Sequence, residues 1–366
     1  MNLKFNRYLA GAALLAASGA ASATTCDSAL WSYTSAVNSG ATGWANELLS
    51  NHPECFAGSS TTSLVQINNT TFQQATAIST ALASRFLDPS SGPQASTGSK
   101  SMAAGGKVAS WNAWGNLSSN DTRQSYQSLT GNTAKYDSDI LTGVLGADYA
   151  LSPVMAVGIS AAFDDGDGTG SNSGSTTGPN SITSKGYVIA PYFGMQINKA
   201  LALDASVGFG QGELGMTGGV AAEADRWFAA ANLSYAQWMD KIQLTGKLSY
   251  LHGEEDYDNS KVNGVAYAGT SAKNKLDQLR LGLQAGYWMN GVMPYAGLTY
   301  SSDLDRSTTQ FAAVSNPIGK DAWMWTLGVN LFAMKSGVTG GIAYNQEEGR
   351  SNQKNNSVMA NINLRF

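Results

Sequence analysis

The fold is decided by the stretch SVMANINLRF, residues 357–366. Every second residue from Val358 to Phe366 is apolar, and the residues between them are mostly polar. A period of two predicts a β-strand with one apolar face. Chain ends of soluble domains are usually frayed and polar. An alternating strand that runs to a terminal aromatic therefore predicts a structural closing strand.

The composition favours a β protein that turns its apolar face to lipid. The chain has 366 residues and 41 glycines, with 43% hydrophobic, 10% aromatic and 13% charged residues. That charged fraction is about half of what soluble domains carry. No run of about 18 apolar residues occurs after residue 23, which argues against a helical membrane protein. A net charge of −4 gives no sign of nucleic-acid binding.

The first 23 residues predict a secretory signal peptide. Lys4 and Arg7 precede a short apolar run, and Ala21-Ser22-Ala23 has the small residues of a cleavage site. We expect cleavage between Ala23 and Thr24 and exclude residues 1–23 from the fold.

Residues 24–60 form a short N-terminal segment that contains both cysteines. An exported chain meets an oxidising compartment, so Cys26 and Cys55 predict one local disulfide. His52 is the only nearby histidine, and three ligands are fewer than a structural metal site needs.

Residues 61–86 predict a helix, because their apolar residues recur mostly every three to five positions. The remaining positions are Gln, Asn, Thr and Ser until Arg85, so most of the helix surface would be polar and uncharged. Residues 87–104, rich in Pro, Gly and Ser, predict a linker.

Residues 105–366 predict an all-β, twelve-stranded antiparallel transmembrane barrel. The strands are expected at 107–117, 136–149, 154–163, 184–197, 200–211, 225–239, 241–252, 277–289, 292–302, 321–333, 336–346 and 355–366. Short links (150–153, 198–199, 240, 290–291, 334–335) alternate with long ones (118–135, 164–183, 212–224, 253–276, 303–320). Short connections at one end and long connections at the other are typical of outer-membrane barrels, and a soluble β-sandwich does not need this arrangement.

Charged residues at the polar positions of these strands are expected to face the lumen, where they would line the pore, bind the helix or simply pair with one another. They are Asp148, Asp204, Arg226, Lys247, Arg280 and Arg365.

No catalytic, cofactor or metal site is expected. His252 is predicted to lie on the lipid side of its strand, and its sequence neighbours supply no nucleophile motif beyond the nearby Ser249. The stretch DDGDGTGSNSG (164–174) begins like a calcium loop, but Thr176 replaces the acid at position twelve. Both it and EEDYD (254–258) are expected to be solvated external loops, with cation bridging to lipopolysaccharide as a less favoured role for the latter.

Residues 105–366 resemble the translocator barrel of the autotransporter family (type V secretion). The likeness is carried by WNAWGNL (111–117), YDSDILTGVLGADYAL (136–151) and the terminal NINLRF (361–366). It implies a Gram-negative outer-membrane protein that periplasmic chaperones and the barrel assembly machinery insert next to lipid and lipopolysaccharide. It also makes Phe366 part of the assembly signal.

The resemblance further implies that 61–86 is a pore helix inside the barrel. Its polar residues there are Gln66, Asn68, Asn69, Gln73, Gln74 and Arg85; some members of the family are cut between two adjacent Asn, as at 68–69. About 37 residues precede the helix after the signal peptide, far fewer than a typical passenger has.

The expected function is a hydrophilic passage for the chain's own N-terminal segment, which the helix afterwards plugs. Two alternatives stay open: a plugged structural or surface-interaction barrel without secretion, and a small porin. The external ligand is unknown.

Overall fold

The computed structural model describes residues 61–86, 111–127, 133–173, 179–216, 220–259, 261–262, 265–266, 272–306, 318–333 and 338–365, and within the helix it describes the side chains of 70–83. The predicted signal peptide, the Cys26–Cys55 pair, the linker and Phe366 lie outside these ranges.

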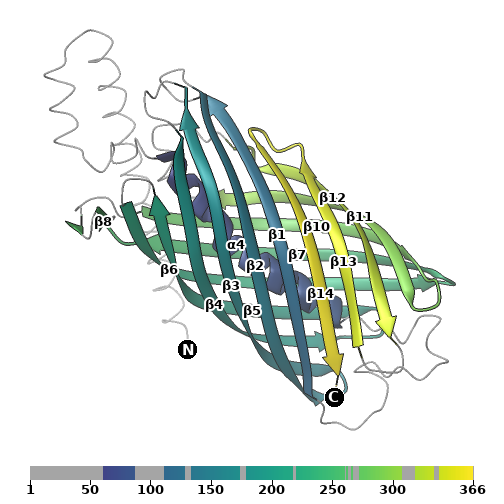
Figure 1. Ribbon diagram of the computed structural model, residues 1–366. Helices are drawn as coiled ribbons and strands as arrows, with labels where there is room; N and C mark the ends of the chain where they lie inside the picture. Colours follow the sequence, from purple (N-terminus) through teal and green to yellow (C-terminus); the bar gives the residue numbers. More distant parts are fainter. Residues whose placement is uncertain are drawn as a thin grey trace, which may run out of the picture.

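In this part of the chain one helix, α4 (Thr61–Phe86), precedes a single antiparallel sheet (Figure 1). The strands are β1 (Trp111–Gln127), β2 (Thr133–Ser152), β3 (Met155–Asn172), β4 (Asn180–Gln196), β5 (Leu201–Met216), β6 (Val220–Met239), β7 (Ile242–Tyr257), β8 (Lys261–Val262), β9 (Val265–Ala266), β10 (Ala272–Tyr287), β11 (Val292–Arg306), β12 (Asp321–Ala333), β13 (Val338–Glu348) and β14 (Gln353–Arg365).

The sheet closes into a barrel of twelve strands, which confirms the predicted fold class. Each long strand pairs with its neighbours in sequence, and β14 pairs with β1 as well as with β13, with Asn112 opposite Arg365. Closure gives the backbone N–H and C=O groups of both edge strands their hydrogen-bond partners, which a barrel in hydrocarbon requires. The two-residue strands β8 and β9, which follow β7 and precede β10 in the sequence, form a small hairpin that pairs with β6.

The strands are longer than predicted at one end of the barrel. We call this the loop end, which carries the connections after β1, β3, β5, β7, β11 and β13; the opposite turn end carries the tight connections. Residues 164–172 and 254–257, predicted as loops, continue β3 and β7. That prediction is wrong, because both faces of these strand ends are polar and the apolar alternation that marks a strand fades there. Positive φ angles at Asp240, Asn290 and Gly291 bend the chain in the tight turns.

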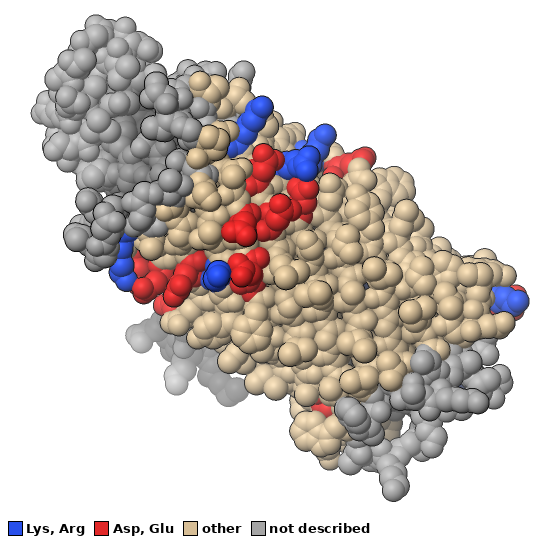
Figure 2. Space-filling view, viewed as in Figure 1, with Lys and Arg blue, Asp and Glu red and all other residues tan. Residues whose placement is uncertain are grey.

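The outer wall is apolar around the middle of the barrel and charged near the loop end. Leu145, Phe209, Leu283 and Leu327 point outward with 60–68% of their surface exposed. Figure 2 shows the Lys, Arg, Asp and Glu side chains gathered towards the loop end, above a broad uncharged area. Such a band is what a strand barrel presents to lipid.

At the loop end, Lys261 of β8 donates a hydrogen bond to Glu223 of β6 at 2.8 Å. This bond raises the pKa of Lys261 above its usual value.

Helix α4 lies inside the barrel and packs against β1 to β7 and β10 (Figure 1). Thr71 contacts Glu255 near the loop end of β7, whereas Leu82 belongs to the same buried cluster as Trp114, near the turn end of β1. The helix therefore runs from the loop end to the turn end. Among the described residues, no helix is both long and apolar enough to cross a membrane.

Candidate functional site: the lumenal seat of the helix

The loop-end part of the helix is held by a carboxylate of the barrel wall. Oε1 of Glu255 accepts hydrogen bonds from the Thr70 hydroxyl at 2.9 Å, the Thr71 backbone N–H at 3.2 Å and the Thr71 hydroxyl. Its other oxygen accepts a bond from Tyr257 at 3.0 Å. Hydrogen bonds to a charged group are among the stronger polar contacts in proteins, so this carboxylate fixes the helix in position and rotation.

Glu255 belongs to a buried ionic group that we call the Arg226 cluster: Asp164, Arg226 and Glu255. Arg226 Nη1 lies 2.7 Å from Asp164 Oδ1, and its Nε lies 3.3 Å from Glu255 Oε1. The Gln74 amide of the helix donates a further hydrogen bond to Asp164. The helix thus supplies only neutral donors to this cluster, in which one guanidinium of the barrel wall faces two carboxylates.

Two glycines give Arg226 its space. A Cβ added at Gly186 of β4 would lie 2.1 Å from Arg226 Nη1, and one added at Gly212 of β5 would lie 2.3 Å from Arg226 Cζ. The guanidinium therefore crosses the lumenal faces of two neighbouring strands, where any side chain would displace it.

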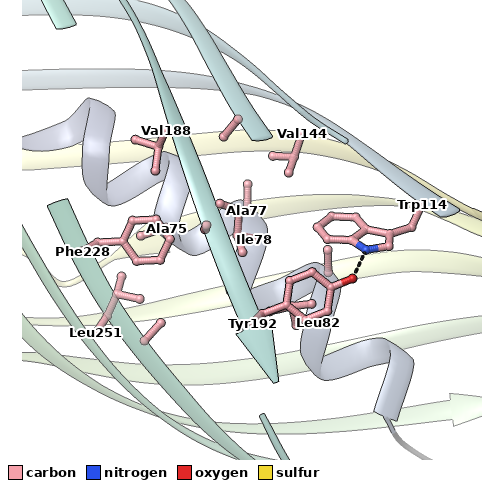
Figure 3. Close-up of a cluster of buried hydrophobic side chains, with 14 of the residues drawn as sticks. Ala75, Ala77, Ile78, Leu82, Trp114, Val144, Val188, Tyr192, Phe228 and Leu251 are labelled. Carbon is pink, nitrogen blue, oxygen red and sulfur yellow. Dashed lines mark hydrogen bonds between the residues drawn. The ribbon is translucent and has the colours of Figure 1, made fainter. Parts of the chain in front are cut away.

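The middle of the helix is held by apolar contacts. Ala75, Ile78 and Leu82 are buried in one cluster with wall residues from several strands (Figure 3). The wall side chains labelled in Figure 3 are Trp114, Val144, Val188, Tyr192, Phe228 and Leu251. The wall that faces this part of the helix is thus partly apolar. Small and branched residues at lumenal positions fit the surface of the helix.

At the turn end, Leu82 lies beside an ordered aromatic pair (Figure 3). The Trp114 indole N–H donates to the Tyr192 hydroxyl at 2.8 Å, and this hydroxyl donates to Asp148 at 2.7 Å. Asn112 donates to the other oxygen of Asp148 at 2.8 Å. Asp148 therefore fixes the aromatic surface on which the helix rests.

Polar contacts also join the helix to the wall between these two ends. Ser79 donates to Asn232 at 2.9 Å, and Asn232 donates to Asp204 at 2.6 Å. On the other side, the Arg280 guanidinium lies 5.0 Å from the centre of the Phe72 ring, a cation–π distance.

The predicted lumenal residues are thus distributed over several contacts rather than one site. Arg226, Asp148 and Asp204 are almost fully buried in the networks above. Lys247 is partly exposed on β7, and Arg365 pairs through its backbone with β1, its side chain lying outside the described part. In the helix, Gln73 and Gln74 are buried. The side chains of Gln66, Asn68, Asn69 and Arg85 are not among those described.

Sequence reasoning missed the residues that bind the helix most directly. Asp164 and Glu255 were expected in solvated loops, yet they are lumenal and buried. The sequence did hold a signal. Asp164 lies two residues after Ala162 and Glu255 lies four residues after Leu251, and residues an even number apart on a strand share a face.

Among the described residues, the side chain of the outer-wall His252 contacts a carboxylate and an aromatic ring. His252 Nδ1 lies 2.6 Å from Asp277 Oδ1, which also accepts a bond from Tyr250, and the ring packs against Trp227 at 4.4 Å. Ser249 lies at an odd spacing from His252 and is buried on the opposite face. Within the described ranges, no group of three or more His, Cys, Asp or Glu residues could hold a metal ion.

A closed twelve-stranded barrel with a helix along its lumen defines the class of outer-membrane translocator barrels. Solved structures of this class superpose on the chain. The translocator domain of NalP from Neisseria meningitidis matches with a TM-score of 0.55 at 12% identity, covering 80% of this chain and 99% of that one. The β-domain of Bordetella BrkA gives 0.52 at 16% identity, covering 70% and 100%. The transport unit of AIDA-I from Escherichia coli gives 0.50 at 14%, covering 76% and 99%. No curated protein matches the sequence.

The family model of the autotransporter β-domain matches residues 113–345, and the chain belongs to this family. Its members are outer-membrane proteins of Gram-negative bacteria, inserted in general by the barrel assembly machinery.

Proposed function

We propose that the barrel forms a hydrophilic passage through which the chain's own N-terminal segment reaches the cell exterior, and that α4 then plugs this passage. The observation that carries the proposal is the direction of the helix. Thr70 and Thr71, in the first half of the helix, contact Glu255 near the loop end, and Leu82 lies near the turn end, so the helix points its N-terminus towards the loop end. In outer-membrane barrels the long connections face outward.

Accessibility of the N-terminal segment in intact cells tests this proposal. A short epitope placed after Thr25 is expected to be labelled by an impermeant antibody without permeabilisation. The matched control carries the same epitope in the tight turn between β6 and β7, at Asp240, which faces the periplasm and needs permeabilisation. An epitope after Thr25 that is labelled only in permeabilised cells would show a plugged barrel without secretion.

Plugging by the helix has its own test. The contacts of α4 with eight of the twelve long strands support its blocking a large part of the lumen. Deletion of 61–86 is therefore expected to raise the conductance of the purified barrel in planar bilayers. An unchanged conductance would refute the plug.

Export and assembly follow from the ends of the sequence. We propose that residues 1–23 direct export, with cleavage between Ala23 and Thr24, that Cys26 and Cys55 then form a disulfide in the periplasm, and that Phe366 takes part in recognition for assembly. The outer wall would contact lipid and, at the loop end, lipopolysaccharide.

A further inference from the structure

The helix fills the lumen from one side only. In the described part of the chain it contacts β1 to β7 and β10, whereas at most marginal contacts join it to β11 to β14. Lumenal side chains on the helix side, such as Asn116, Ser160, Ser206 and Ser234, are all buried. The lumen is therefore divided lengthwise into a half that the helix fills and a half that the helix leaves free.

The lumenal residues of that other half are partly exposed to solvent. On β12 they include Thr326 and Asn330, and on β14 Ser357, Asn361 and Asn363. Their direction follows from the alternation: Trp325, Leu327, Val358 and Ile362 between them point outward and are exposed on the apolar wall. We call these five residues the polar strip.

The polar strip carries no charge. Thr326 donates to Asn345 of β13 at 2.8 Å, and Asn345 donates to Ser357 at 3.0 Å, so hydroxyl and amide groups join the three strands across the lumenal face. Hydroxyl and amide groups can replace part of the hydration shell of a passing ion, and they bind neither cations nor anions strongly.

Each end of the strip is bounded by ordered side chains. At the loop end, Arg350 donates to Asp303 at 2.8 Å, to Glu347 at 2.9 Å and to the Gly319 carbonyl at 2.8 Å. At the turn end, the rings of Trp288 and Phe332 lie 5.2 Å apart. Neither group includes a residue of the helix.

We propose that the polar strip lines a water-filled pathway for small hydrated ions that stays open beside the seated helix. The proposal rests on the seating of α4 proposed above, and it adds a conducting state to the plugged barrel.

Cysteine modification in planar bilayers tests this pathway in the full-length protein with its helix in place. Asn361→Cys is treated with a positively charged, impermeant thiol reagent, and Thr326→Cys serves as a second reporter. Because each added group narrows the strip and places a charge in it, conductance is expected to fall roughly twofold and selectivity to shift towards anions. Ser234→Cys, buried on the helix side, is the matched control, and the parent chain receives the same treatment.

The outcomes separate this inference from plugging. If modification at 361 and 326 is verified by mass and the current is unchanged, the pathway does not run along the strip and the inference is wrong. If the full-length chain carries no current but the chain lacking 61–86 does, the inference is also wrong while plugging stands. If deletion of 61–86 leaves conductance unchanged, plugging fails, whatever the reagent does.

Discussion

Arg226 on β6 reaches Asp164 on β3, with 2.7 Å between Nη1 and Oδ1, although two strands lie between them in the barrel wall. Both side chains are almost completely buried. A buried ion pair that loses one partner leaves an uncompensated charge, which is costly. Asp164 of this pair also accepts a hydrogen bond from Gln74, so one contact contributes both to the stability of the wall and to the seating of the helix.

Substitution of Gly212 by alanine is expected to displace Arg226, because the new Cβ would lie 2.3 Å from its Cζ. Crowding of a packed site costs roughly 1–3 kcal/mol. The unfolding temperature of the barrel, followed by loss of its compact form on SDS gels, should therefore fall. Gly143→Ala is the matched control, since its Cβ would meet the nearest side chain only at 4.0 Å. Equal unfolding temperatures for the two variants would contradict this role for Gly212.

The change Thr71→Val keeps the shape of the side chain but removes the hydroxyl that donates to Glu255. A hydrogen bond to a charged group contributes roughly 1.5–3 kcal/mol, so exchange of the helix amides should become roughly 10- to 100-fold faster. Hydrogen exchange read by mass spectrometry measures this. Thr80→Val, the same substitution at a partly exposed position of the helix, should leave the rates near those of the parent. If both variants exchange alike, the Glu255 contact does not hold the helix.

The fold could be predicted from the sequence because the lipid-facing residues are apolar at every second position over the middle of the strands. In Leu201 to Phe209 and Leu279 to Tyr287 the residues between them are small, polar or charged. Tight turns such as Asn290-Gly291 also have a local signature. Closure between β1 and β14 then follows from the need to satisfy every backbone group in hydrocarbon.

The helix seat could be predicted only in part. Parity alone predicts Asp148, Asp204 and Arg226 on the lumenal face, and all three are buried. Parity does not show where a strand ends once both of its faces are polar, so Asp164 and Glu255 were assigned to loops. Nor does the sequence of one strand reveal which wall the helix approaches, since that depends on contacts between distant strands.

The terminal aromatic offers a test of assembly. Deletion of Phe366 is expected to lower the yield of folded barrel in the outer-membrane fraction, while export across the inner membrane continues and full-length chain accumulates in the periplasm. Phe366 directly follows β14, the strand that pairs with both β1 and β13 to close the sheet, so a signal at this position would act on the closing strand. Phe366→Tyr, which keeps an aromatic ring, should assemble nearly as well as the parent. Normal insertion of the deleted chain would rule out an assembly role for Phe366.

Loss of apolar contact at the turn end should loosen the helix independently of the Arg226 cluster. Leu82 is fully buried beside Trp114 and Tyr192, so Leu82→Ala is expected to lower the free energy of helix release by roughly 2–5 kcal/mol. Leu283→Ala, on the outer wall with 68% exposure, is the control and should leave helix exchange unchanged.

Residues 71 and 82 are separated by about 16 Å along the helix, and contacts at that distance usually contribute additively within about 0.5 kcal/mol. The variant carrying both Thr71→Val and Leu82→Ala should therefore show the sum of the two losses if α4 leaves its seat as one rigid unit. If the helix amides of the double variant exchange no faster than those of the less stable single variant, the two ends of the helix open separately. In that case neither contact alone would retain the plug.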